Sequence, residues 1–301
     1  MGLFDRLIAG SVRFLPKPVV KRVADRYVAG EDLTDAIRAV RELNQAGCRA
    51  TVDVLGEYVR DEREAASNAA SYVAVLDAIA REKLDSNVSI KLTAFGLDLS
   101  TDVAFRHARS VVDHAKKLGN FVRIDMENSP YTDRTIDLYG ALRREFDNVG
   151  IVLQACLRRT PDDVEALLPI GGHFRLCKGI YVESRAIAWR QPDVVNRNYA
   201  HCLRKMLSGG AFVGIATHDE RLVFEALRIL DELKIRPDRF EFQMLLGVDE
   251  ALRAIILKLG HPVRVYVPFG RDWYGYSLRR LKENPKIAGY VFKAMLPGGG
   301  R

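Results

Sequence analysis

Eight short runs with the composition of buried strands recur along the chain, and stretches of helical periodicity separate them. The runs are rich in valine, isoleucine and phenylalanine, as expected for parallel strands that are covered on both faces. They comprise residues 50–55, 87–93, 121–126, 150–156, 174–179, 211–217, 239–245 and 263–268. An amphipathic pattern over residues 101–119 is typical of the intervening segments, and Gly119 is placed to end that helix. Strict alternation of strand and helix predicts a parallel sheet.

The number of strand–helix units favours a closed barrel over an open sheet. Eight units within about 250 residues is the usual size of a (βα)8 barrel, which belongs to the α/β class. The alternative is a doubly wound open sheet, which binds dinucleotides through a glycine-rich turn after its first strand. Here the first run is followed by GEYVRDE, which contains one glycine. We therefore predict a TIM-type barrel without a Rossmann site.

The residues before the first strand form a predicted helical arm. Residues 33–47 carry an apolar stripe that ends at a glycine, and residues 18–30 repeat this pattern. The first fifteen residues are largely apolar, with Arg6 and Arg13 between the apolar positions. We predict an arm over residues 1–48 and a barrel over residues 49–301, together forming one domain. The arm either packs on the barrel or places its first helix on a membrane surface.

Composition excludes several classes of function. The net charge is +7, but 46 basic residues are interspersed with 39 acidic ones and form no basic block with aromatic residues between, so nucleic-acid binding is not expected. The four cysteines have no metal-binding spacing and are predicted to be buried thiols in a reducing compartment. The six histidines form no ligand pair, so no metal site is predicted. No apolar run reaches the roughly 18 residues of a membrane span.

Polar residues stand at the carboxyl ends of nearly all the predicted strands. In a (βα)8 barrel these ends build the active site. In chain order the residues are Asp53 and Glu57, Lys91 and Thr93, Asp125 and Glu127, Gln154, Arg175 and Lys178, Thr217 and His218, Gln243, and Tyr266. Charged groups are rarely buried without partners, so we expect Lys91 to lie beside Asp125 and Arg175 beside Gln154.

The segment YGYSLRRLKEN follows the last strand by a few residues. On a helix, Tyr276, Arg279, Arg280 and Glu283 share one face. Such a face is either a solvated surface with an internal ion pair or a clamp for an anion, since two planar guanidinium groups suit a carboxylate or phosphate. Because this helix begins at the rim of the predicted active site, the clamp is favoured.

These segments resemble those of the proline dehydrogenase family. The similarity is carried by DVLGE, IKLTAFG, RIDME, LQACLRR, RLCKGIY, ATHD, EFQMLLG and YVPFG…YGYSLRRLKEN, in that order along residues 49–284. The resemblance implies a barrel enzyme that binds FAD and oxidises L-proline to Δ1-pyrroline-5-carboxylate, with a hydride passing from the proline ring to flavin N5. It further implies the short, monofunctional form, a membrane quinone as electron acceptor and a pyrroline-5-carboxylate dehydrogenase as a partner.

The resemblance assigns three cations to the proline carboxylate. These are Arg279, Arg280 and Lys91, and it assigns the balancing negative charge to Asp125 and Glu283.

The same resemblance assigns the walls of the substrate pocket. Tyr266 and Leu245 would lie against the proline ring, and Asp125 would form hydrogen bonds to Lys91 and Tyr266. Glu57 would pair with an arginine to close the site.

For the flavin, the resemblance assigns a set of contacts from strands three to six. Arg175 would reach the N5 edge, where a cation stabilises reduced flavin, and with Asp125 it is the predicted organising group of catalysis. The remaining predicted contacts are Met126, Gln154, Lys178, Gly179, Ile180, Thr217 and His218, the last two at the diphosphate. The family usually has alanine where this chain has Ile180, which calls the local fit of flavin or substrate into question.

Two other functions are compatible with the same barrel. Lys178 could form a Schiff base in a flavin-free lyase or aldolase, if Arg175 lowered its pKa. A non-enzymatic basic barrel that binds anionic surfaces is the second alternative. The dehydrogenase reading predicts a cytoplasmic protein that contacts the inner face of the cell membrane through its first helix.

Overall fold

The computed structural model describes the backbone of residues 17–283 and, within it, the side chains of residues 20, 21 and 24–278. Its strands form one closed barrel in the order β1-β2-β3-β4-β5-β6-β7-β8. All eight pairings, including the closure of β1 onto β8, are parallel. The strands are β1 (Arg49–Val54), β2 (Ser86–Ile90), β3 (Val122–Ile124), β4 (Val149–Gln154), β5 (His173–Cys177), β6 (Phe212–Ala216), β7 (Phe240–Leu245) and β8 (Val263–Phe269). This confirms the predicted (βα)8 barrel.

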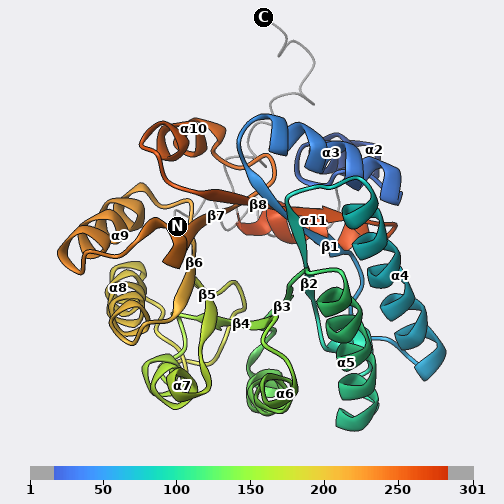
Figure 1. Cartoon of the computed structure of the whole chain (residues 1–301), viewed down its shortest axis with the longest axis horizontal. Coiled ribbons are helices and arrows are strands. Elements are labelled where there is room, and N and C mark those ends of the chain that lie inside the picture. The colour runs from blue at the N-terminus through green and yellow to red at the C-terminus, as the bar shows by residue number, and fades with distance from the viewer. Residues whose placement is uncertain (1–16, 284–301) are drawn as a thin grey trace, which may run out of the picture.

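Helices surround the ring of strands (Figure 1). They are α2 (Lys17–Tyr27), α3 (Leu33–Gln45), α4 (Glu62–Arg81), α5 (Thr101–Lys117), α6 (Thr132–Glu145), α7 (Thr160–Leu167), α8 (Pro192–Ser208), α9 (Glu220–Glu232), α10 (Glu250–Lys258) and α11 (Trp273–Glu283). Short 3-10 turns are η2 (Thr93–Phe95), η3 (Ser129–Tyr131), η4 (Leu168–Ile170) and η5 (Pro237–Arg239). Asp61, Ser100, Asp219 and Asp249 cap α4, α5, α9 and α10 through their side chains, which satisfies backbone amides that a helix start leaves unpaired.

The lower end of the barrel, where the strands begin, is charged rather than apolar. Glu241 accepts hydrogen bonds from Arg264 Nε at 2.6 Å and from Arg49 Nη1 at 3.3 Å. Arg123, which is 2% exposed, donates to the carbonyl oxygen of His173 at 2.6 Å and to His173 Nδ1 at 2.8 Å. These pairings let guanidinium groups occupy the interior without losing all their hydrogen bonds.

The described part of the N-terminal arm packs on the barrel. α3 contacts β1 and β8, and α2 contacts α11. A second apolar cluster joins the two ends of the described chain through Val20, Tyr27 and Tyr276. Residues 17–48 therefore pack on the barrel, which is one of the two predicted alternatives for the arm. The predicted membrane helix in the first fifteen residues lies outside the described residues.

Candidate active site

One cavity of about 890 Å³ opens at the carboxyl ends of the strands. Its volume falls within the range of cofactor and small-molecule sites. Every described residue to which the resemblance assigned a substrate, flavin or gate role lines this cavity: Glu57, Lys91, Asp125, Met126, Gln154, Arg175, Lys178, Gly179, Ile180, Thr217, His218, Leu245 and Tyr266. Of the other polar residues expected at the strand ends, Gln243 lines it, whereas Asp53, Thr93 and Glu127 do not. The predicted positions Arg279, Arg280 and Glu283 belong to α11, but their side chains lie outside the described residues. Tyr276 from the same helix lines the cavity.

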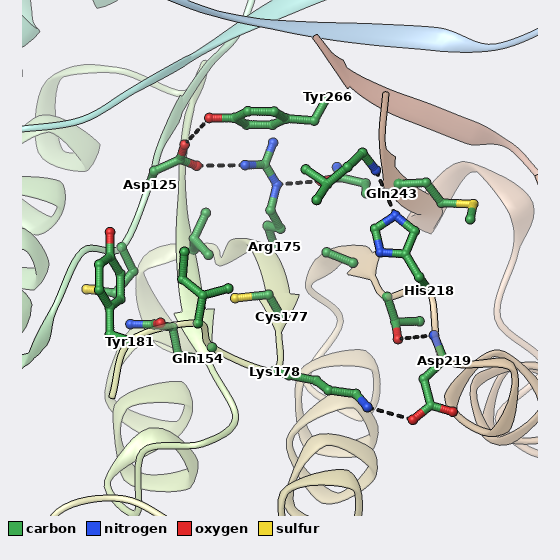
Figure 2. A pocket seen from close by; sticks show the side chains of 18 of the residues that line it. Asp125, Gln154, Arg175, Cys177, Lys178, Tyr181, His218, Asp219, Gln243 and Tyr266 are labelled. Atoms are coloured by element: carbon green, nitrogen blue, oxygen red, sulfur yellow. Dashed lines mark hydrogen bonds and ion pairs between the residues drawn. The ribbon is translucent and has the colours of Figure 1, made fainter. Parts of the chain in front are cut away.

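Asp125 is the centre of a hydrogen-bonded group on one wall of the cavity (Figure 2). Its Oδ1 accepts from Arg175 Nη1 and from the Ser89 hydroxyl, each at 2.7 Å, and its Oδ2 accepts from the Tyr266 hydroxyl at 2.7 Å. The guanidinium carbon of Arg175 lies 5.3 Å from the centroid of the Tyr266 ring. The predicted bond between Asp125 and Tyr266 is therefore present, and side chains from β2, β5 and β8 converge on Asp125, which follows β3.

The predicted bond between Lys91 and Asp125 is wrong. Lys91 Nζ instead donates to both carboxylate oxygens of Asp53, at 2.7 and 2.8 Å. Asp53 is 0% exposed and Asp125 already has Arg175 as its cation, so the deeper carboxylate gains more from the ammonium group. Burial lowers the pKa of Lys91, but the Asp53 and Asp125 carboxylates outweigh burial and raise it, so the lysine is cationic.

The predicted neighbour of Arg175 is also wrong. Gln154 lies in register with Cys177, two residues beyond Arg175. Its amide donates to the backbone carbonyl of Glu127 at 2.9 Å. Arg175 reaches across the barrel instead, and its Nε donates to Gln243 Oε1 on β7 at 2.5 Å.

The opposite end of the cavity holds a further ion pair (Figure 2). Lys178 Nζ lies 2.6 Å from Asp219 Oδ2. Burial opposes ionisation of Asp219, but its hydrogen bonds to Lys178 and Asn196 outweigh burial and lower its pKa. The ion pair with Asp219 occupies the Lys178 ammonium group, whereas a Schiff-base lysine must present a free amine nitrogen to a carbonyl carbon. This contact counts against the lyase interpretation.

The loop after β5 forms part of the cavity rim. Gly179 has a φ of +97°, and a Cβ at this position would lie 2.3 Å from Cys156 Sγ, so glycine is required. Ile180 lines the cavity and is 48% exposed, so its extra bulk relative to alanine is not packed into the protein interior. Glu183 fixes the loop to η3, because its carboxylate accepts from the Ser129 amide at 2.7 Å and the Ser129 hydroxyl at 2.6 Å.

Comparison with known proteins agrees with this geometry. The family model described as proline dehydrogenase matches residues 36–292. This chain belongs to the proline dehydrogenase family. It is 37% identical over 273 residues to proline dehydrogenase 1 of Bacillus subtilis subsp. natto, covering 91% of this chain and 90% of that protein. It is 34% identical over 292 residues to the proline dehydrogenase of Deinococcus radiodurans, covering 95% and 94% of the two chains.

A solved structure supports the same fold. The crystal structure of proline utilization A (PutA) from Bdellovibrio bacteriovorus, inactivated by N-propargylglycine, superposes with a TM-score of 0.82 at 25% identity. The match covers 88% of this chain and 33% of that chain, so this proline dehydrogenase family member corresponds to about a third of the PutA chain.

Membership of the proline dehydrogenase family implies a flavin cofactor, and the cavity fits one. Met126, Val152 and Leu245 provide apolar surface for a planar ring system. Arg175 provides a largely buried cation, with 8% of its side chain exposed. At the other end, α9 begins at the cavity edge beside Lys178, Thr217 and His218, which add polar groups, while Asp219 caps this helix and pairs with Lys178.

Several contributors to the site were not assigned a role from the sequence. From the sequence, Asp53 and Gln243 are only polar residues near strand ends, and neither Ser89 nor Asp219 is predicted to belong to the site. Ser89 precedes Lys91 by two residues in the same strand segment, so the period of two could have placed it on the same face. Lys178, which pairs with Asp219, follows β5, and Arg175, which bonds Gln243, lies on β5, so no local pattern identifies either contact.

Two negative findings concern the described part of the chain only. Among residues 17–283, no cluster of histidine, cysteine and acidic side chains is arranged to hold a metal ion. No described helix combines the length and the apolar character needed to cross a membrane.

Proposed function

We propose that this protein oxidises L-proline to Δ1-pyrroline-5-carboxylate with FAD as its cofactor. The observation that carries the proposal is the convergence of Asp125, Arg175, Tyr266 and Lys91 on one cavity at the active-site end of the barrel. Family membership supplies the reaction class, and the cavity supplies both the cations and the apolar walls that a proline and a flavin need.

The substrate carboxylate is assigned to Arg279, Arg280 and Lys91. Lys91 is held by Asp53, so its ammonium group is fixed before proline arrives and less ordering is needed on binding. Glu283 balances the charge of the arginine pair. The proposal for α11 rests on its position after β8 and on Tyr276, which lines the cavity three residues before Arg279.

The ring of proline is assigned to the space beside Tyr266 and Leu245. The Tyr266 hydroxyl donates to Asp125, so the phenol ring is held in place and shields the ring carbons from water. Glu57, which lines the cavity mouth, is the proposed gate residue.

The flavin is assigned to Arg175 and to the residues that follow β3 to β6. Bound flavin supplies the two-electron acceptor for the hydride that leaves the ring carbon next to nitrogen. Arg175 presents a positive charge where the accepting ring gains electrons, and Asp125 keeps that charge in place. Proline is proposed to bind after its ammonium group has lost a proton to solvent, so that the nitrogen lone pair forms the C=N bond as the hydride leaves; the product iminium then releases its N–H proton to solvent, and no residue is assigned as a general base.

The electrons are proposed to reach a membrane quinone, and the product is proposed to pass to a pyrroline-5-carboxylate dehydrogenase. The first fifteen residues, apolar with arginines between, are the proposed membrane contact of a chain with a net charge of +7. Deletion of residues 1–15 should abolish salt-sensitive binding to anionic liposomes, and unchanged binding would remove this segment as the anchor.

The test of the activity is spectroscopic and kinetic. The purified protein should show flavin absorption, release FAD on denaturation, and lose its absorption when L-proline is added without oxygen. It should also reduce an artificial dye acceptor in the presence of proline. A flavin-loaded protein that proline does not reduce would refute the proposal, and trapping of a carbonyl substrate on Lys178 by borohydride would favour the lyase instead.

A further inference from the structure

Arg175 is held by a chain of buried side chains that runs down the inside of the barrel. Arg175 Nε donates to Gln243 Oε1 at 2.5 Å. Gln243 Nε2 donates to Glu241 Oε1 at 2.7 Å. Glu241 accepts in turn from Arg264 and Arg49, so the chain connects the cavity to the lower end of the barrel.

The orientation of the Gln243 amide is dictated by Glu241. An ionised carboxylate only accepts hydrogen bonds, so it can pair only with the NH2 group of the amide. Burial opposes ionisation of Glu241, but Arg264 and its other hydrogen-bond donors outweigh burial and lower its pKa, so it is ionised at neutral pH. The amide oxygen of Gln243 is therefore the atom that faces Arg175. A reversed amide would set two donors against each other.

β6 leaves space for this contact. Gly214 lies in register with Arg175 on one side and with Glu241 on the other. A Cβ at Gly214 would lie 2.4 Å from Gln243 Nε2, so any larger residue would displace the amide. The absence of a side chain at Gly214 therefore allows Gln243 to lie between Arg175 and Glu241.

Two of the three guanidinium nitrogens of Arg175 are committed by these contacts. Nε is held by Gln243, and Nη1 is held by Asp125 and by the Ser89 hydroxyl at 3.1 Å. Within the described part of the chain, Nη2 forms no hydrogen bond. These contacts fix the plane of the Arg175 guanidinium group from two sides, and Nη2 remains available to donate to a ligand.

We infer that Glu241 and Gln243 are positioning residues that fix the orientation of Arg175 for the flavin. The inference rests on the proposed function, in which Arg175 stabilises the reduced cofactor. Gln243 acts directly on Arg175, and Glu241 acts through the Gln243 amide. Neither residue exchanges a proton or electron in the reaction.

The test uses Gln243→Met, which removes the hydrogen-bonding oxygen at similar size, and Gly214→Ala, which keeps every polar group but crowds the amide. Gln154→Met is the control for the exchange readout alone, because Gln154 is itself a proposed flavin contact but lines the same cavity and bonds Glu127 rather than Arg175. The first readout needs no cofactor: solvent exchange of the Arg175 Nε proton, followed by NMR in protein labelled with ¹⁵N-arginine. The second readout is the midpoint potential of the bound flavin.

Both test variants should exchange the Arg175 Nε proton at least tenfold faster than wild type, and the control should not. If the protein's preference for binding reduced over oxidised flavin falls tenfold, the two-electron midpoint potential of the bound flavin falls by about 30 mV. A wild-type exchange rate of the Arg175 Nε proton in Gln243→Met would overturn the inference. If Gln243→Met does not fold, the same result in Gly214→Ala would overturn it. A wild-type protein that fails to oxidise proline would refute the proposed function, while the exchange measurement would still decide whether Gln243 holds Arg175.

Discussion

Replacement of Asp53 by asparagine removes one charge from the most deeply buried ion pair of the site. Asp53 is 0% exposed on its side chain and Lys91 is 12% exposed, so solvent screens their attraction little. Loss of one member of a buried pair costs about 3–5 kcal/mol, because the other charge is left in the interior. Asparagine keeps one acceptor oxygen, and Asp125 still attracts Lys91, so we expect the lower limit, about 3 kcal/mol. With an unfolding entropy of about 2.1 cal/mol/K per residue, this lowers the Tm by about 5 °C.

The measurement is equilibrium urea unfolding of wild type, Asp53→Asn, Lys91→Met and the double variant, at one fixed concentration of free flavin because bound ligand adds to stability. The double variant should be more stable than the sum of the single effects predicts, by about 2 kcal/mol or more. Asp231→Asn is the control, since its ion pair with Lys234 is 82% and 79% exposed and should contribute less than about 1 kcal/mol. Equal losses in Asp53→Asn and Asp231→Asn, or strictly additive single effects, would refute the reasoning.

Three further predictions concern the substrate and the lower end of the barrel. Arg280→Met should lower kcat/KM for proline by about 30-fold to several thousand-fold, because loss of a desolvated charge pair costs about 2–5 kcal/mol. Most of the loss should appear as a higher KM. Arg279→Met should have a similar effect, and the two losses should not add in the double variant. Tyr266→Ser should relax a strong preference for proline over hydroxyproline, measured as the ratio of the two kcat/KM values. Burial and the charge of Arg123 hold the pKa of His173 well below 6.5, so only the unfolded state gains a proton below that pH. His173 should therefore lower the free energy of unfolding by about 1.4 kcal/mol between pH 7.5 and 5.5, and the decrease should be smaller in His173→Asn.

Each of these predictions has a result that would contradict it. A wild-type KM in a fully flavin-loaded Arg280→Met or Arg279→Met would return that arginine to a solvated helix face. Equal kcat/KM for proline and hydroxyproline in the wild type would remove Tyr266 from the pocket wall. The same pH dependence in wild type and His173→Asn would show that His173 titrates alike in the folded and unfolded states.

The fold was predictable because its signal is local. Each strand carries its own apolar run, and the alternation with helices determines the parallel barrel without knowledge of any contact. The observed strands agree with the predicted runs to within a few residues; β2 is an example, since it ends at Ile90 whereas the predicted run continued to residue 93. The location of the cavity followed from the barrel itself.

The pairings inside the site were not predictable from strand order. Lys91 stands between Asp53 and Asp125 along the ring of strands, and the choice depends on how deeply each carboxylate is buried. Arg175 bonds Gln243 two strands away rather than a residue on the adjacent strand, because a long side chain spans the barrel interior. Such choices are set by depth and reach, which a sequence pattern does not contain.

The contact between α2 and α11 has a consequence for synthesis of the chain. Val20 and Tyr27, which are among the first described residues to leave the ribosome, pack in one cluster with Tyr276 and Trp273, which are among the last. Lys21 Nζ also lies 4.8 Å from the centroid of the Trp273 ring. Residues 273 and 276 follow all eight strands in the chain, so during synthesis this contact can form only after every strand has been made. Damage to α2 should therefore appear first as weak substrate affinity in an otherwise folded barrel.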